Sequence, residues 1–241
     1  MTKAALPKGT LYLIPAPLGE GVLTQILPLG VQQCLSAITH FVVEHPKTAR
    51  HFLKQVTGLP PLGSLELMEL NEHTSADILP ELLIPLLNGQ DVGLLSDAGC
   101  PAVADPGAAL VRLAHQHGIK VTPLVGPTSI LLALMASGLN GQRFCFHGYL
   151  PVPQDLRNRK ILALEKCSRQ KDETQIFIET PYRNLRLLEA LLQHCNTQTQ
   201  ICVACNLTLT DEYISTRTIG DWRHGSLPDI HKQPTVFLLQ G

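Results

Sequence analysis

Short apolar runs alternate with amphipathic segments through the first half of the chain. An apolar run bounded by Gly, Pro, Asp or Ser is typical of a buried strand, and apolar positions three and four residues apart indicate a helix. Strands are therefore expected at residues 11–17, 40–45, 64–70, 91–97 and 120–127. Helices are expected at residues 24–38, 46–56, 75–89, 105–118 and 128–138, with internal prolines in the first and third. Strands that are apolar on both faces and alternate with helices predict a mainly parallel sheet covered on two sides.

The pattern changes after residue 140, where strands follow one another more closely. We expect strands at residues 143–151, 174–180, 200–208, 212–222 and 234–241, and helices at residues 157–167 and 184–195. Closely spaced strands favour antiparallel or mixed pairing. The chain is thus interpreted as an N-terminal α/β domain over residues 1–123 and a C-terminal α/β domain with a mixed sheet over residues 124–241.

Composition narrows the functional classes. The 241 residues suit one large domain or two small ones. Lys and Arg total 19 against 20 Asp and Glu, so the chain is not a strongly basic nucleic-acid binder, although a local basic patch is compatible with this balance. Charged residues are scarce, at 16% against 44% hydrophobic residues, which hints at a further buried face such as a subunit interface.

The cysteines indicate a reducing compartment. There are seven, and the CxxC pair Cys202 and Cys205 falls inside an apolar strand pattern, which places the two thiols on opposite faces of the strand. That arrangement is poor for a metal or a redox pair, so we expect buried, reduced thiols and a cytoplasmic protein. No apolar run is long enough for a membrane span, and the first residues lack the apolar core of a secretion signal.

Three loops join a strand to a helix and place Gly next to Pro: residues 14–21, 96–107 and 125–138. Taken singly, each is an ordinary turn, since Gly and Pro dominate turns. Taken together, three such loops at the carboxyl ends of parallel strands predict a groove that binds a small polar ligand through main-chain groups. The chain has neither GxGxxG after its first strand nor GxxxxGK[ST], so the usual nicotinamide and triphosphate motifs are absent from the sequence.

The same loops carry a resemblance to a known family. The order and spacing of five segments hold over nearly the whole chain: APLGE (16–20), SDAGCPAVADPG (96–107), VGPTSILLALMASGL (125–139), RFCFHGYLP (143–151) and IETPYR (178–183). On these segments the chain resembles the tetrapyrrole (class III) methylase superfamily, which uses S-adenosylmethionine. Its branch is similar to ribosomal RNA small-subunit methyltransferase I, which methylates a cytidine 2′-hydroxyl. The resemblance implies two α/β domains with an active-site cleft between them, and a homodimer.

The resemblance also implies the cofactor site. We expect S-adenosylmethionine to contact the following residues: Pro17, Leu18, Gly19, Ser96, Asp97, Ala98, Gly99, Pro101, Asp105, Pro127, Thr128, Ser129, Ile178 and Leu207. A carboxylate such as Asp97 can accept a hydrogen bond from the ammonium group of the methionine part. Alternatively, Asp105 merely caps the helix that follows it, and Thr128 or Ser129 caps the next one. Glu179 and Arg183 form either part of the site or an ion pair.

The acceptor side departs more from the family pattern. Where the branch has the motif EDTR, this chain has Glu44-His45-Pro46-Lys47, and where the branch has ELTK, this chain has residues 206–209 (NLTL). The basic segment of the branch is reduced here to Arg157, Arg159 and Lys160. We take Glu44, His45 and Glu72 as candidate catalytic residues, because a hydroxyl acceptor must lose a proton. His45 or His73 is a candidate base, although each is alternatively an ordinary surface histidine. No cluster has convincing metal-ligand spacing.

These observations favour an S-adenosylmethionine-dependent methyltransferase acting on ribosomal RNA ribose. The alternatives are methylation of a tetrapyrrole-like or other small acceptor, and a protein that binds the cofactor without catalysis. A generic α/β enzyme with another nucleotide ligand is a further alternative. No membrane partner is expected.

Overall fold

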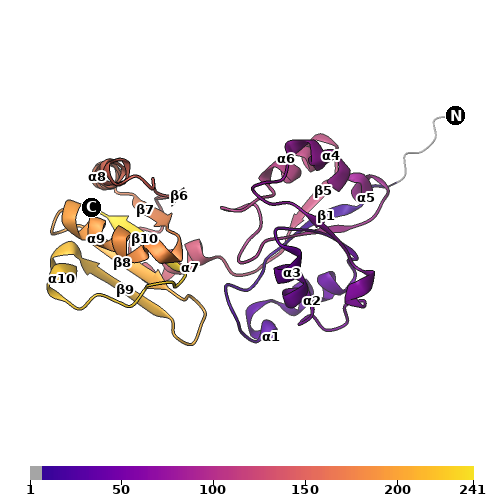
Figure 1. Ribbon diagram of the computed structural model, residues 1–241, viewed down its shortest axis with the longest axis horizontal. Helices are drawn as coiled ribbons and strands as arrows, with labels where there is room; N and C mark the ends of the chain where they lie inside the picture. The colour runs from indigo at the N-terminus through magenta and orange to yellow at the C-terminus, as the bar shows by residue number, and fades with distance from the viewer. Residues whose placement is uncertain (1–6) are drawn as a thin grey trace. The chain divides into compact units, whose positions relative to one another are not determined.

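The protein folds into two α/β units, seen in the computed structural model of Figure 1, which describes residues 7–241. Unit 1 extends to Pro127 and unit 2 comprises Thr128–Gly241. The sequence pattern places the division a few residues earlier, after residue 123. None of the helices between residues 7 and 241 is long and apolar enough to cross a membrane.

Unit 1 is built on five parallel strands. They are β1 (Thr10–Ile14), β2 (His40–Val43), β3 (Glu66–Glu69), β4 (Val92–Leu95) and β5 (Lys120–Pro123). Their order across the sheet is β3-β2-β4-β1-β5, and every neighbouring pair is parallel. All four residues of the central strand β4 are buried, as its continuous apolar run predicts.

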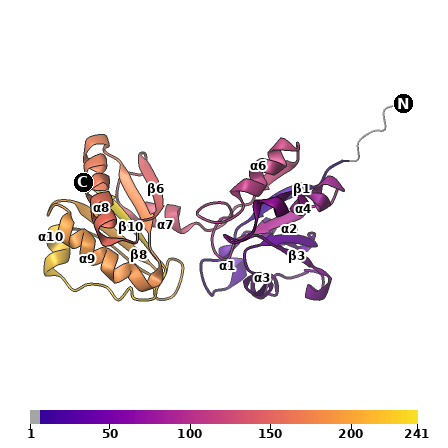
Figure 2. The same ribbon diagram turned by 45° about the horizontal axis from the view of Figure 1, so that its top comes forward.

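Helices cover both faces of this sheet (Figures 1 and 2). One face packs against α1 (Leu23–Ile26), α2 (Leu29–Ser36) and α3 (Pro46–Leu53). The other packs against α4 (Leu79–Leu82), α5 (Ile84–Leu87) and α6 (Ala108–Gln116). Short 3₁₀ turns, η1 (Leu62–Ser64) and η2 (Ala76–Ile78), complete the connections.

Prolines divide two of the expected helices. The helix expected at residues 24–38 is interrupted at Pro28, which becomes the N-cap of α2. The helix expected at residues 75–89 is split into η2, α4 and α5, with Pro80 and Pro85 in the first turns of α4 and α5. A proline lacks the N–H that a helix interior needs but is tolerated in the first turn, so each proline restarts a helix.

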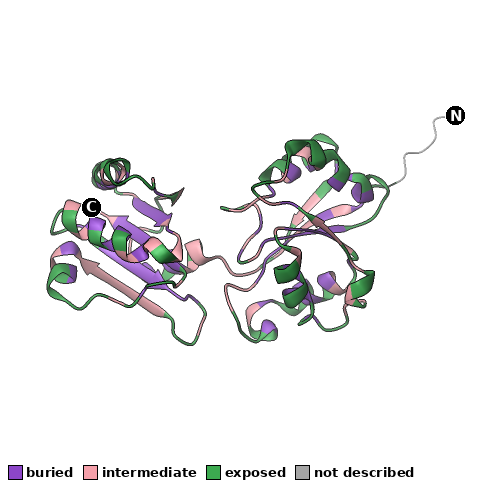
Figure 3. Cartoon of the chain, viewed as in Figure 1, coloured by how far each residue is buried: buried purple, intermediate pink, exposed green. Residues whose placement is uncertain are grey.

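Unit 2 has a mixed sheet, as expected. Its strands are β6 (Phe144–Tyr149), β7 (Thr174–Ile178), β8 (Gln200–Cys205), β9 (Tyr213–Thr218) and β10 (Thr235–Gln240). They are ordered β6-β7-β10-β8-β9, with β6 and β7 parallel and the other pairs antiparallel. The strands at the centre are buried, while the outer sides of the helices are exposed (Figure 3).

Helices also cover both faces of the second sheet. One face packs against α8 (Gln154–Lys171), α9 (Asn184–His194) and α10 (Ile219–His224), and the apolar helix α7 (Ser129–Ser137) contacts β8, β9 and β10. The turn η3 (Pro181–Arg183) precedes α9. Trp222 of α10 is fully buried, and its indole Nε1 donates a hydrogen bond to the carbonyl of Ile201 at 3.0 Å.

Two expected boundaries in unit 2 are wrong. The strand expected at residues 212–222 ends at Thr218, because the Thr218 hydroxyl accepts a hydrogen bond from the amide of Asp221 and starts α10 there. The helix expected at residues 157–167 is α8, which is longer at both ends. Its C-terminal extension adds Arg169 and Lys171 to the basic residues of this segment, which the sequence pattern indicates as weak.

The seven cysteines are all free thiols. Cys205 belongs to the core between β8 and α9, whereas Cys202, three residues earlier on the strand, points to the opposite face, as predicted. Burial raises the pKa of both thiols, so neither is poised as a thiolate ligand or nucleophile.

Candidate functional site

Loops from separate strands of unit 1 meet at the carboxyl edge of its sheet. The loop after β1 and the loop after β4 pair through main-chain hydrogen bonds in both directions between Ala16 and Gly99, with N···O distances of 2.8 and 3.0 Å. Because β1 and β4 are parallel neighbours, both loops leave the sheet at the same edge. The expected convergence of these two loops is confirmed.

The loop after β5 joins the same group. The thiol of Cys100 donates a hydrogen bond to the carbonyl of Pro127, with an Sγ···O distance of 3.4 Å. Gly126 lies directly against the ring of Pro15: a Cβ at position 126 would stand 2.2 Å from Pro15 Cγ. Only glycine permits that approach, so the Gly-Pro composition of these loops serves their mutual packing.

The loop after β4 has an unusual backbone. Gly99 and Gly107 have φ values of 75° and 121°, and between them Ala102 and Ala104 also adopt positive φ, at 64° and 60°. An alanine in this region costs about 1 kcal/mol, and such strain is concentrated at ligand-binding and catalytic loops. Among the described residues, the amide groups of Ala98 and Cys100 donate no hydrogen bond, so main-chain donors remain available to a ligand.

The residues expected to hold a cofactor fall into one set in each unit. Those in unit 1 lie in the three loops just described: Pro17, Leu18, Gly19, Ser96, Asp97, Ala98, Gly99, Pro101, Asp105 and Pro127. In unit 2, Ile178 ends β7 and Leu207 follows β8; both strands run antiparallel to β10, so these two residues lie at one edge of the sheet. Thr128 and Ser129 begin α7, and Thr128 makes no side-chain cap.

A histidine and two carboxylates gather at the ends of β2 and β4. The register pairs Val43 with Leu95, so the residues two positions further on, His45 and Asp97, stand side by side. His45 Nδ1 lies 2.7 Å from Asp97 Oδ2, and a Glu44 carboxylate oxygen lies 3.5 Å from the amide nitrogen of Asp97. Sequence reasoning assigned Glu44 and His45 to the acceptor and Asp97 to the cofactor, and did not foresee this contact.

This position is a point where the topology of unit 1 reverses. The chain leaves β2 toward α3 on one face of the sheet and leaves β4 toward α6 on the other face. In open α/β sheets, ligands bind outside the carboxyl ends of two neighbouring strands whose connections diverge in this way. The third candidate catalytic residue, Glu72, is not in the group, and its exposed carboxylate lies 3.5 Å from His73 Nε2.

The donor atoms of Glu44, His45 and Asp97 lie within 4.8 Å of one another, a spacing that the sequence did not indicate and that is compatible with a cation. The 2.7 Å contact between His45 and Asp97, however, has the length of an N–H···O hydrogen bond. A proton therefore lies between Nδ1, which donates it, and the carboxylate oxygen, which accepts it, and we treat His45 and Asp97 as a hydrogen-bonded pair.

Asp105 does not cap a helix, contrary to one of its two expected roles. The helix α6 begins at Ala108, and its N-cap is Gly107, which has no side chain to accept a hydrogen bond. Burial raises the pKa of Asp105 to about 6, the charge of Glu44 adds to the effect, and a hydrogen bond with Ser96 opposes it. Asp105 therefore belongs to the electrostatic surroundings of the Glu44 and Asp97 carboxylates.

We expect the substitution Asp105→Asn to stabilise the protein selectively at neutral pH. The pKa of Asp105 is higher in the folded state than the ordinary value of 3.8, so the stability that it contributes is present below pH 4 and is lost as the pH rises through about 6. Because the carboxyl is partly exposed, we discount the effect to roughly 1 kcal/mol. Urea unfolding at pH 4.5 and 7.5 measures this difference in the free energy of unfolding. The same pH dependence of that free energy in the variant and the wild type would contradict the prediction.

Glu179 and Arg183 form an ion pair, which resolves the two roles that the sequence left open. Glu179 Oε1 accepts hydrogen bonds from Arg183 Nε at 2.9 Å, from Arg183 Nη2 at 2.7 Å and from the amide of Thr180 at 2.7 Å. The Glu179 side chain is only 1% exposed. The pair therefore supports the junction between β7 and α9.

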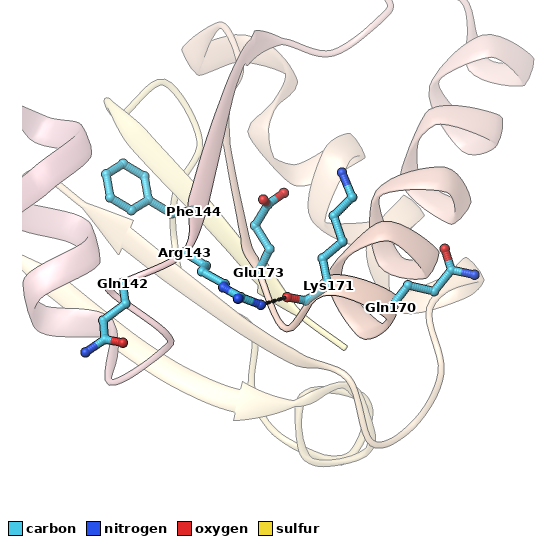
Figure 4. A pocket seen from close by; sticks show the side chains of 6 residues that line it. All are labelled: Gln142, Arg143, Phe144, Gln170, Lys171 and Glu173. Carbon is cyan, nitrogen blue, oxygen red and sulfur yellow. Dashed lines mark hydrogen bonds between the residues drawn. The ribbon is translucent and has the colours of Figure 1, made fainter.

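A pocket of about 510 Å³ lies elsewhere in unit 2 (Figure 4). It is lined by Gln142, Arg143, Phe144, Gln170, Lys171 and Glu173. Arg143 Nη1 donates to the carbonyl of Lys171 at 3.1 Å, at the end of α8. The pocket lies where β6 and β7 begin, at the sheet edge opposite to Ile178, so within unit 2 it is separate from the predicted cofactor residues Ile178 and Leu207.

Comparisons with known proteins place these features in context. Residues 11–222 match the family described as Tetrapyrrole (Corrin/Porphyrin) Methylases. The chain is 34% identical to ribosomal RNA small subunit methyltransferase I of Vibrio cholerae, over 87% of this chain and 69% of the relative. It is 33% identical to the protein of the same name from Escherichia coli O157:H7, over 89% of this chain and 71% of the relative.

Solved structures have the same fold at lower identity. The methyltransferase CobJ superposes with a TM-score of 0.63 and 22% identity, over 97% of this chain and 94% of that one. Uroporphyrin-III C-methyltransferase of Thermus thermophilus, in complex with S-adenosylhomocysteine, superposes with a TM-score of 0.56 and 16% identity, over 96% and 97% of the two chains.

Proposed function

Because the chain belongs to the tetrapyrrole (corrin/porphyrin) methylase family and is an S-adenosylmethionine-dependent methyltransferase, we propose that it methylates a ribose 2′-hydroxyl of small-subunit ribosomal RNA. The observation that carries the choice of acceptor is the identity of about a third to ribosomal RNA small subunit methyltransferases I over most of the chain. The uroporphyrin-III C-methyltransferase of Thermus thermophilus is less similar, at 16% identity.

The residues of unit 1 fit the cofactor. The free amide groups of Ala98 and Cys100 offer donors to it, and the carboxylate of Asp97 at the same edge suits its ammonium group. When bound, the cofactor supplies an electrophilic methyl group on a sulfonium that leaves as a neutral thioether. The protein must therefore hold the acceptor oxygen in line with that methyl group and receive the hydroxyl proton. We propose Glu44, His45 and Glu72 for the acceptor side.

Helix α8 supports an RNA acceptor. It carries six basic residues against two acidic ones, although the whole chain has a net charge of −1. Arg159, Lys166 and Arg169 are exposed and recur at spacings of seven and three residues, so they share one side of the helix. Neither Arg159 nor Lys166 has a carboxylate partner among the described residues. Unpaired cations on one helix side suit the phosphates of an RNA strand.

The proposal predicts methyl transfer to small ribosomal subunits that lack the modification. Incubation with radiolabelled S-adenosylmethionine should label their RNA, and the labelled nucleotide should resist alkaline hydrolysis at its 3′ side, because a 2′-O-methyl group blocks that cleavage. The KM for the subunit should rise steeply with salt. Labelling of a tetrapyrrole but not of RNA would reject the proposed acceptor.

Variants of α8 separate RNA binding from cofactor binding. Replacing Arg159 and Lys166 together with Gln should raise the KM for the subunit about tenfold and weaken its salt dependence, with an unchanged affinity for S-adenosylhomocysteine. Lys54, an exposed cation beyond the end of α3 in unit 1, is the control: Lys54→Gln should change neither quantity. Equal effects of both substitutions would point to net charge instead of a site on α8.

A homodimer and a cytoplasmic location stay predictions.

A further inference from the structure

His45 and Asp97 have the geometry of a base and its orienting carboxylate. Asp97 Oδ2 lies 2.7 Å from Nδ1 of His45. An ionised carboxylate only accepts hydrogen bonds, so neutral His45 carries its proton on Nδ1 and leaves Nε2 as an acceptor. Nε2 contacts no other polar group of the described residues, and the imidazole side chain is 57% exposed, whereas Asp97 is less so at 36%.

The position of the pair favours a functional role over an ordinary surface contact. Both residues follow neighbouring parallel strands at equal distance from the paired residues Val43 and Leu95, so the sheet itself sets their separation. They stand where the connections of β2 and β4 diverge, beside the loop that holds two alanines at positive φ.

The charges that act on His45 from the described residues of unit 1 are negative. Glu44 precedes it, Glu69 ends β3, and Asp97 with Asp105 extends from β4. The hydrogen bond that His45 donates to Asp97 is the main cause that raises the pKa of His45 above 6.5, the charges of Asp97, Glu44 and Glu69 add to it, and burial opposes them. The pair is therefore more basic than a free imidazole, and the imidazolium formed after proton uptake is stabilised.

We propose that His45 is the general base for the acceptor hydroxyl and that Asp97 is its positioning residue, an inference that rests on the proposed methyl transfer. As the hydroxyl oxygen bonds to the methyl carbon, its proton passes to His45 Nε2. The bond between that carbon and sulfur breaks, and its electron pair stays on sulfur. Asp97 holds the proton on Nδ1 throughout, as in other His–Asp pairs.

The first test follows the histidine itself and needs no turnover. The imidazole resonance of His45, assigned by its loss in His45→Asn, should titrate above the ordinary range in the wild type. In Asp97→Asn it should titrate at lower pH, because an amide neither carries the charge nor accepts the proton equally well. Unchanged titration in Asp97→Asn would overturn the pairing, whatever the acceptor of the enzyme proves to be.

The second test is the pH profile of methyl transfer under single turnover. The wild-type rate should rise with pH up to the pKa of His45 and then level off, since the base must be neutral. His45→Asn should lower the rate about a hundredfold and remove this rise, while S-adenosylhomocysteine affinity stays within about threefold. In Asp97→Asn, the methyl-transfer rate should rise over a lower pH range than in the wild type. His51→Asn, an exposed histidine of α3, is the control and should behave as the wild type.

The outcomes separate the two proposals. If the wild type binds S-adenosylhomocysteine but methylates no ribosomal subunit, the proposed acceptor is refuted. The titration of the His45 imidazole then still tests whether His45 and Asp97 form the proposed pair. A His45→Asn variant with wild-type rate and pH profile refutes the base. Calorimetric binding of Mg²⁺ to the free protein that is lost in Asp97→Asn would show that this cluster holds a cation and would equally overturn the role of His45.

Discussion

Replacing Arg183 with Met is expected to lower the free energy of unfolding by about 3 kcal/mol. The substitution removes the guanidinium that donates two hydrogen bonds to Glu179 Oε1, and leaves a carboxylate whose side chain is 1% exposed. Glu179 Oε2 has no hydrogen-bond partner, so after the substitution the amide of Thr180 is the one donor left to this carboxylate among the described residues. Urea unfolding followed by circular dichroism measures the loss.

A matched control is available in the next helix. Arg186 of α9 is exposed and has no ion pair among the described residues, so Arg186→Met should change stability by less than about 0.5 kcal/mol. The double variant Glu179→Gln with Arg183→Met should recover part of the loss, because the buried charge is then gone. Similar stabilities for the two single variants would contradict the role of the pair.

Gly126→Ala should destabilise unit 1 by about 2 kcal/mol. The added Cβ would lie 2.2 Å from Pro15 Cγ and 2.4 Å from Pro15 Cβ. A proline ring has no alternative rotamer that makes room, so the loops after β1 and β5 must separate. Because these loops belong to the predicted cofactor site, the affinity for S-adenosylhomocysteine should fall at least about tenfold, as calorimetry can measure.

Gly63→Ala is the control for this substitution. Gly63 lies in η1 of the same unit, and no atom approaches the position of an added Cβ within 4 Å. The stability of the Gly63→Ala variant and its affinity for S-adenosylhomocysteine should match those of the wild type. A Gly126→Ala variant that also matches the wild type would mean that the contact between the loops is not needed for their conformation.

The sheets could be predicted because apolar strand patterns are local. The run at residues 91–97 gave the buried strand β4, and the closely spaced strands after residue 140 gave a mixed sheet. The predicted ends of helices and strands are wrong where a single side chain determines them. Thr218 and Asp221 form a capping arrangement, and this T-x-x-D signal within residues 212–222 was read as a continuous strand.

The site could be predicted only in part. Gly and Pro revealed the three loops, since those residues act through local backbone geometry. The contact between His45 and Asp97 depends on β2 and β4 being neighbours although β3 lies between them in the chain. Strand order is a property of the whole sheet, and no local pattern near residue 45 or 97 encodes it.

The location of the single tryptophan has a practical consequence for every stability experiment on this protein. Trp222 is enclosed in the core of unit 2, and unit 1 contains no indole. Tryptophan fluorescence, excited selectively, therefore reports on the melting of the second unit alone, whereas circular dichroism averages over both. A difference between the two unfolding curves would reveal, without any added label, whether the halves of the chain melt together or one after the other.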